Sequence, residues 1–164
     1  MIDNWPILSI VTFMPLAGVL FLLMIKGDET TVAQNSRYVA LWVSGFTFLV
    51  SLPLLMAFDS TAADYQFEEK GIWLAGTGIG YHMGVDGISM PFVLLSTFLM
   101  PLSILASWNA VTHRVREYMI AFLVLETMMI GMFVSLDMLM FYLFFEAVLI
   151  PLFLIVGVWG GSRR

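Results

Sequence analysis

Residues 141–153, FYLFFEAVLIPLF, place a single acid, Glu146, inside a run that is otherwise almost entirely apolar. About 20 consecutive apolar residues are needed to cross the hydrocarbon core of a bilayer as a helix. The run lies within a longer apolar window, residues 139–159, which we predict to be a membrane-spanning helix. The stretch therefore indicates a membrane protein, and it raises the question of why a carboxylate lies at membrane depth.

The composition of the whole chain agrees with this prediction. Apolar residues make up 60% of the 164 residues and charged residues only 12%, which is about half the share usual in soluble domains. The formal net charge of -5 and the lack of a basic stripe argue against a nucleic-acid partner. The sequence contains no cysteine, so disulfides, thiolate metal ligands and cysteine nucleophiles are excluded.

Hydropathy predicts an all-α membrane protein with a single membrane domain, residues 1–164. Five spans are expected, at residues 5–25, 39–58, 88–108, 118–136 and 139–159. Segment 59–87 is too polar and too glycine-rich to cross; within it, YQFEEKGIWL (65–74) and IGYHMGV (79–85) predict a small external hairpin around an AGTG turn. The first span lacks a basic leading region, so we interpret it as a retained helix and not as a signal peptide.

The basic residues predict the orientation of the spans. Six of the seven lie in the first linker, in the third linker or after the fifth span: Lys26, Arg37, Arg114, Arg116, Arg163 and Arg164. The positive-inside rule assigns these regions to the cytoplasm or its equivalent, so the N-terminus starts outside. We expect a multi-pass protein of the bacterial inner membrane, or of the mitochondrial inner membrane if the chain is organellar, with lipid around it.

Glu146 is the strongest candidate functional residue. Counted from Leu139 at 1.5 Å per residue, it lies about 10 Å inside the hydrocarbon. An ionised side chain there costs about 3 kcal/mol, so this acid must be neutral, paired or beside water. Pro151 cannot donate a hydrogen bond to the carbonyl of Ala147, which leaves an acceptor free next to the acid. We predict that Glu146 handles protons; a simple proline kink is the alternative interpretation of Pro151.

The cation that would pair with Glu146 is missing from the predicted spans. Every Lys and Arg of the sequence falls in a linker or after the last span. We therefore expect the partner of Glu146 beyond residue 164 or on another subunit.

Four further residues deserve a prediction. Glu126, in FLVLETMMIGMF (122–133), lies near the middle of the fourth span. It would act as a possible relay with Glu146, or would hydrogen-bond a hydroxyl or backbone group in its protonated form. Asp86 is expected to cap the third helix. His82 and His113 are expected to be solvated loop histidines, since neither has a second metal ligand at suitable spacing. We predict no metal site and no cofactor in the chain itself, because phosphate loops and Cys/His ligand sets are missing.

The motifs resemble a known family. YHMGVDGISMPFVLLSTFLMPLSILASW, REYMIAFLVLETMMIGMFVSLDMLMFYLFFEAVLIPLFLIVGVWGG and the opening helix are similar to the subunit M (chain 4) family of proton-translocating NADH:quinone oxidoreductase, respiratory complex I. The resemblance covers essentially the whole chain. Its most specific pieces are GVDGIS and FYLFFEAVLIP.

The resemblance implies the N-terminal part of an antiporter-like subunit in the membrane arm of that enzyme, with other membrane-arm subunits as partners. It implies proton translocation coupled to quinone reduction, while NADH, FMN, iron–sulfur clusters and quinone would bind in the rest of the complex. In the family an acid on the fifth helix, which matches Glu146, pairs with a lysine on the seventh; the match of Glu126 is less decisive. Family members are longer, so that lysine would lie outside these residues.

Two alternatives stay open from the sequence. A subunit of a multi-chain cation/proton antiporter or of a membrane-bound hydrogenase would share the antiporter-like fold. A non-transporting membrane scaffold would use Glu146 only to lock helix packing.

Overall fold

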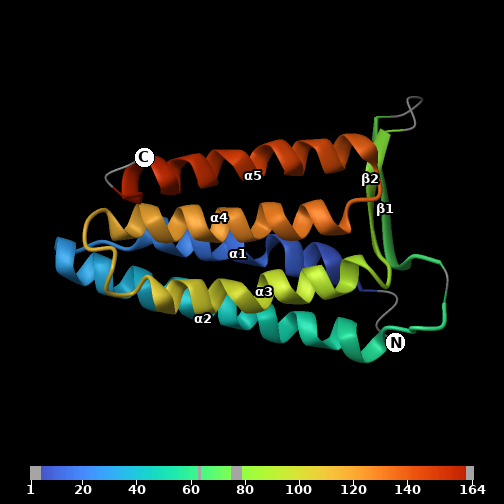
Figure 1. The fold of residues 1–164 in the computed structure, drawn as a ribbon, viewed down its shortest axis with the longest axis horizontal. Coiled ribbons are helices and arrows are strands. Elements are labelled where there is room, and N and C mark those ends of the chain that lie inside the picture. Colours follow the sequence, from blue (N-terminus) through green and yellow to red (C-terminus); the bar gives the residue numbers. More distant parts are fainter. Residues whose placement is uncertain (1–4, 63, 75–78, 162–164) are drawn as a thin grey trace.

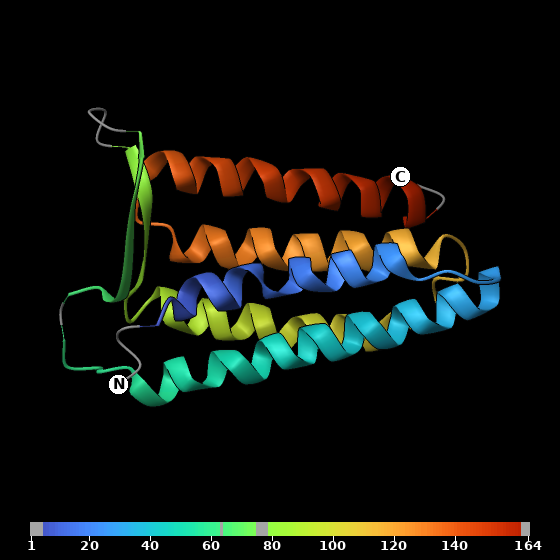
Figure 2. The same cartoon turned by 180° about the vertical axis from the view of Figure 1, so that it is seen from behind.

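A computed structural model describes residues 5–62, 64–74 and 79–161 of the chain. In chain order its elements are α1 (Ile7–Met24), α2 (Glu29–Ala57), β1 (Gln66–Leu74), β2 (Ile79–Val85), α3 (Ser89–Ala106), α4 (Val115–Val134) and α5 (Met138–Trp159). The helices run lengthwise beside one another and the two strands cross one end of the bundle (Figures 1 and 2). All five helices are long and apolar enough to cross a membrane. The predicted fold class is thus confirmed.

The bundle has two chemically different ends. We call the end with the strands the hairpin end. The opposite end holds the α1–α2 and α3–α4 linkers together with the last turn of α5, and we call it the basic end (Figure 1). The expected grouping of the first and third linkers on one side is therefore present in the fold.

Helix α2 begins ten residues earlier than the hydropathy pattern predicts. Its start is marked by Asp28, whose carboxylate accepts a hydrogen bond from the Thr31 amide at 3.2 Å, and Glu29 follows in the first turn. At 1.5 Å per residue the 29 residues of α2 measure about 43 Å, more than the roughly 30 Å of a hydrocarbon core. Arg37 consequently lies in α2 and not in a linker, because polar residues of the first turns hid the helix from a hydropathy window.

The expected hairpin is present, and it is attached to α1. Strands β1 and β2 pair antiparallel, and the AGTG turn lies outside the described residues. The Glu69 carboxylate of β1 accepts hydrogen bonds from the Leu8 amide at 2.7 Å and the Ser9 amide at 3.2 Å. It also bonds the Ser9 hydroxyl, which in turn contacts the hydroxyl of Tyr81. Since Pro6 at the start of α1 provides no side-chain cap, the hairpin caps this helix from about sixty residues away.

The hairpin also meets the turns before α3 and α5. Asp86 accepts hydrogen bonds from the Ile88 and Ser89 amides at 3.0 and 2.7 Å, which confirms its predicted capping role at α3. At the α4–α5 turn, the Leu136 amide donates to the carbonyl of His82 at 2.9 Å. His82 differs from the expected loop histidine: it lies in β2, with its ring 2.9 Å from the Glu68 carboxylate. The hairpin therefore joins the ends of several helices.

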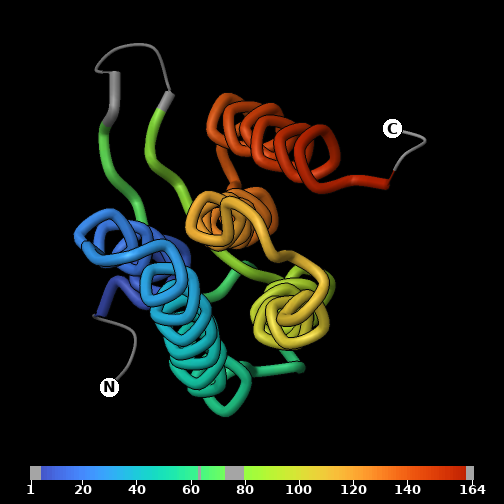
Figure 3. Tube along the Cα trace, turned by 90° about the vertical axis from the view of Figure 1, so that its left-hand side faces the viewer, coloured from blue at the N-terminus to red at the C-terminus, as the bar shows by residue number. Residues whose placement is uncertain are grey.

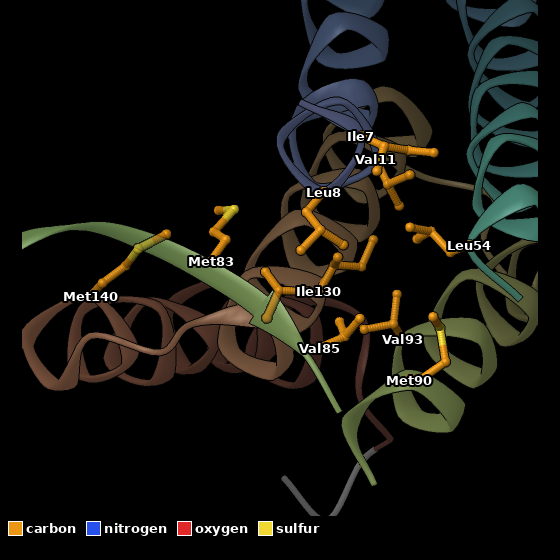
Figure 4. Packing of buried hydrophobic residues seen from close by; sticks show 11 residues of the cluster. Ile7, Leu8, Val11, Leu54, Met83, Val85, Met90, Val93, Ile130 and Met140 are labelled. Atoms are coloured by element: carbon orange, nitrogen blue, oxygen red, sulfur yellow. The ribbon is translucent and has the colours of Figure 1, made fainter. Parts of the chain in front are cut away.

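Two apolar clusters fill the interior, one toward each end. The hairpin-end cluster consists of Ile7, Leu8, Val11, Leu54, Met83, Val85, Met90, Val93, Ile130, Val134 and Met140 (Figure 4). The basic-end cluster consists of Leu22, Ala40, Met100, Ile104, Val111, Val115, Tyr118, Met119 and Leu123. Helix α4 contributes to both clusters and packs against every other helix, whereas α5 lies at the edge against α4 (Figure 3).

Candidate functional site

Helix α5 carries Glu146 and is held to the rest of the chain along one side. Asp137 caps its first turn by accepting hydrogen bonds from the Leu139 and Met140 amides at 2.9 and 3.0 Å. The bond from Met140, the largest cause, keeps the pKa of Asp137 below its ordinary value. At the other end, the indole of Trp159 donates to the carbonyl of His113 at 2.9 Å. His113 is thus in contact with α5, as a stacked neighbour of Trp159.

Between these two attachments, Glu146 lies on the face of α5 that is turned away from the other helices. Its side chain is exposed in the described chain, while Met140 and Pro151 are the buried residues of α5. Glu146 lines an open groove of about 620 Å³ on the outward face of α5, whose other walls are apolar: Leu143, Ala147, Leu149, Ile150, Phe153 and Leu154. A carboxylate in an apolar groove at membrane depth is poorly solvated. This face of α5 therefore offers the carboxyl of Glu146 only apolar neighbours.

Pro151 lies on the opposite, buried side of the same helix. Helix α5 continues without interruption from Met138 to Trp159, so Pro151 is accommodated within it. Its missing N–H still leaves the carbonyl of Ala147 without the usual helical donor. Ala147, which follows Glu146 in the chain, also lines the groove.

Over the described part of the chain, Glu146 forms no ion pair and no hydrogen bond. Of the basic residues there, Arg37 donates to the carbonyl of Val111 at 2.8 Å, Arg116 to that of Ile25 at 3.4 Å, and Lys70 pairs with Glu68. The first two bonds lie at the basic end and the third in the hairpin. The helices that the structure describes offer no cation at the depth of Glu146.

Glu126 lies at the same depth in a different environment. It is eight residues before Val134, the last residue of α4, while Glu146 is eight residues after Met138, the first of α5. Both acids are thus about 12 Å below the hairpin-end termini of adjacent helices. Glu126 is fully buried, however, and neither of its carboxyl oxygens has a hydrogen-bond partner among the described residues. The hydroxyl or backbone bond considered for it in the sequence is not present.

Glu126 belongs to a band of polar residues between the two apolar clusters. Along α1 to α4, the fully buried residues between these clusters are hydroxyl residues, Glu126, a proline and a glycine, and none is a larger apolar residue. We call this band the polar layer: Thr12, Pro15, Gly18, Ser44, Thr47, Ser51, Ser96, Thr97, Glu126 and Thr127. One contact across it joins the hydroxyls of Ser51 and Thr97 at 3.1 Å.

Sequence reasoning missed the polar layer, although α2 carried a signal for it. Ser44, Thr47 and Ser51 are spaced three and four residues apart, which places them on one face of a helix. Small hydroxyl residues occur at packed helix interfaces in membranes, so the spacing predicts a buried face. That Glu126 lies at the same level depends on how four helices are staggered, and a single sequence does not contain that information.

The fold and these two acids define a class of protein: a multi-pass helical membrane subunit with ionisable side chains at the level of the hydrocarbon. Comparisons with known proteins make the assignment more specific. Residues 10–136 match the family model described as NADH-ubiquinone oxidoreductase chain 4, amino terminus. The chain therefore belongs to the family of chain 4, also named subunit M, of that oxidoreductase.

Individual relatives agree with the family. The chain is 54% identical over 159 residues to NADH-quinone oxidoreductase subunit M of Rhodobacter capsulatus, covering 96% of this chain and 30% of the relative. It is 45% identical over 150 residues to NADH-ubiquinone oxidoreductase chain 4 of Arabidopsis thaliana, covering 92% and 30%. A chain of respiratory complex I from Thermus thermophilus superposes with a TM-score of 0.75 at 26% identity, covering 96% and 30%. The chain thus spans about a third of the length of these relatives.

Proposed function

We propose that the chain is part of the membrane arm of a proton-translocating NADH:quinone oxidoreductase, in which Glu146 takes up and releases a proton during turnover. Family membership supports the enzyme assignment. The single observation that carries the role of Glu146 is its exposure, without a partner, in an apolar groove at membrane depth. An acid in such a place changes its protonation when a nearby charge approaches or withdraws.

The proposed partner of Glu146 is a cation from outside the described residues, supplied by further chain or by a neighbouring subunit. Approach of this cation would favour the carboxylate, and its withdrawal would favour the neutral acid. The carbonyl of Ala147 would accept a hydrogen bond from a water or a neutral donor in the groove. Glu126 is the proposed second acid of the relay, supported by its equal depth on the adjacent helix.

The wider assignment follows from the same family. NADH, FMN, iron–sulfur clusters and quinone are proposed to bind in other subunits, so that this chain contributes to proton transfer and has no redox centre of its own. The other membrane-arm subunits and lipid are its proposed neighbours. The hairpin end is proposed to lie outside the cytoplasm or its equivalent, because the described basic residues other than Lys70 cluster at the opposite end.

The test replaces Glu146 with Gln in the assembled complex and measures two rates in membrane vesicles: electron transfer from NADH to quinone, and proton pumping. We expect Glu146→Gln to remove most of the pumping, whereas Glu146→Asp should retain part of it because a carboxyl remains. Glu117→Gln is the matched control, since Glu117 lies in the first turn of α4 at the basic end. Normal pumping by an assembled Glu146→Gln complex would exclude the proposal and leave a scaffold role for this acid.

A further inference from the structure

A second acid, Glu126, lies in the described interior, and the cation proposed as the partner of Glu146 does not account for its burial there. Of the fully buried side chains in the described ranges, Glu126 is the only acid or base. It occupies the same helical stripe as Leu123 and Ile130, at spacings of three and four residues. Leu123 belongs to the basic-end cluster and Ile130 to the hairpin-end cluster. Glu126 therefore points into the core that α4 shares with α1, α2 and α3, and not toward the outward face of α5.

The surroundings of Glu126 decide its protonation state. At its level the buried residues of α1, α2 and α3 are hydroxyl residues, a proline and a glycine, and none of them is charged. The other acid at this depth, Glu146, is exposed on the outer side of α5. An isolated carboxylate loses its hydration there without gaining a cation, which is far more costly than burying the neutral acid. A neutral carboxyl is favoured, and it then has an O–H to donate.

The remaining hydrogen-bonding groups point to a ligand. Both oxygens of Glu126 lack a partner among the described residues, as do the buried hydroxyls of Thr12 and Thr127. Thr127 follows Glu126 in α4, and Thr12 lies in α1, which packs against α4. In contrast, Ser51 and Thr97 of the same layer bond each other and their own helices. Buried polar groups without protein partners are normally bridged by water, which needs two to four polar neighbours.

We infer that the polar layer is a water-binding site in which Glu126 stays protonated and bonds, through water, to the hydroxyls of Thr12 and Thr127. Its ligand class is water together with one exchangeable proton. The two apolar clusters close it toward both ends of the bundle. This site lies on the inner side of α4, whereas the groove of Glu146 lies on the outer side of α5. The inference concerns the resting state and does not depend on the proposed relay, because burial among uncharged residues favours a proton on Glu126 whether or not that proton moves during turnover.

Infrared spectroscopy of the resting, assembled complex tests the inference. A protonated carboxyl gives a C=O stretch distinct from the bands of a carboxylate, and this stretch shifts when water and exchangeable protons are replaced by deuterium. We expect Glu126→Gln to remove one such band and Glu126→Asp to move it. Glu146→Gln is the matched control and should leave the same band in place. The Asp variant retains a readable carboxyl if the Gln variant does not assemble.

Two further variants test the bridging water. Thr12→Val and Thr127→Val remove one hydroxyl each at nearly constant shape, and we expect both to shift the band of Glu126. Ser103→Ala is their control, since Ser103 lies outside the polar layer, is only partly buried and bonds the carbonyl of Leu99 in its own helix. A spectrum in which Glu126→Gln removes no carboxyl band would overturn the inference, because the acid would then be ionised. A band that responds neither to deuterium nor to either threonine variant would also overturn it, because the acid would be dry.

Discussion

Helices α4 and α5 are neighbours in sequence, each with an acid at the same depth, yet their surroundings differ. Half of the α4 span is buried within the chain against 11% of the α5 span. Helix α4 packs against all four other helices, while α5 packs against α4 and β2. Depth alone therefore does not define the chemistry of an intramembrane acid. Its distance from the axis of the bundle also matters: Glu126 must find partners inside these helices, and Glu146 outside them.

Replacing each acid with lysine is the strongest test of this difference between Glu126 and Glu146. In Glu126→Lys a cation without a partner enters the core of α1 to α4, and we expect a loss of about 3–5 kcal/mol, enough to prevent folding. In Glu146→Lys the charge stays on the outer face of α5 and does not enter the packed core, so the loss of stability should be clearly smaller than in Glu126→Lys. Thermal unfolding of the two variants in detergent measures the difference. Equal destabilisation would mean that radial position does not separate the two acids.

Glycines at close helix contacts test the same difference between the inner helices and α5, with smaller expected losses of stability. A Cβ added at Gly18 would lie 2.7 Å from Val43 and 2.9 Å from Leu123, where three helices meet. A Cβ at Gly131 would lie closer still to the ring of Phe144, but α5 packs against α4 and β2 on one side only. We expect Gly18→Ala to cost about 1–3 kcal/mol and Gly131→Ala less, even though the contact at Gly131 is shorter.

Matched glycines control for helix propensity in that experiment. Gly45 in α2 and Gly157 in α5 have nothing within 4 Å of an added Cβ. Alanine at either position should stabilise its helix by up to about 1 kcal/mol. If Gly131→Ala proves more damaging than Gly18→Ala, then α5 is held as rigidly as the inner helices, and the contrast between the two regions is weaker than the packing indicates.

The hairpin end offers a third contrast, between two adjacent acids of β1. Glu69 caps α1, whereas Glu68 pairs with Lys70 and His82 near the surface. Removing a helix cap costs about 0.5–2 kcal/mol, so Glu69→Ala should lower the stability by that amount. Glu68→Ala should cost less than this, because exposed ion pairs contribute little to stability. Hydrogen exchange at the Leu8 and Ser9 amides provides the local readout and should accelerate in the Glu69 variant alone.

The smallest expected effect is a pH dependence at the basic end. Hydrogen bonds from Thr30 and Thr31 lower the pKa of Asp28 from 3.8 to about 2. Because the folded-state pKa is depressed, the capping contribution is fully present above pH 3.8 and is lost as the pH falls toward 2. Thr30→Val removes the largest cause and should raise the pKa of Asp28 toward its ordinary value. A carboxyl carbon titration by NMR measures this, and an unchanged pKa would refute the assigned cause.

Much of this architecture follows from the sequence, for identifiable reasons. The five helices and both strands are visible because long apolar windows and turn residues are local signals. The start of α2 is less visible, since Asp28 and Glu29 mark it only through capping chemistry. The position of Glu146 along its helix could also be predicted by counting residues.

Other properties of the site could not be predicted from one sequence. Which acid faces inward depends on how α4 and α5 rotate about their axes, and the polar layer depends on the stagger of four helices. The remote cap of α1 by Glu69 depends on where the hairpin folds back. Each of these is a long-range relation, and hydrophobic periodicity reports only on the local chain.

That remote cap has a consequence for the order of biosynthesis. Helix α1 enters the membrane before α2, but the carboxylate that satisfies its Leu8 and Ser9 amides is made only after α2 has been synthesised. Until then, water at the membrane surface must hydrate these amides, which holds the start of α1 at the boundary of the bilayer. The docking of Glu69 thus marks the moment when the first two helices and the strand segment have reached their correct sides.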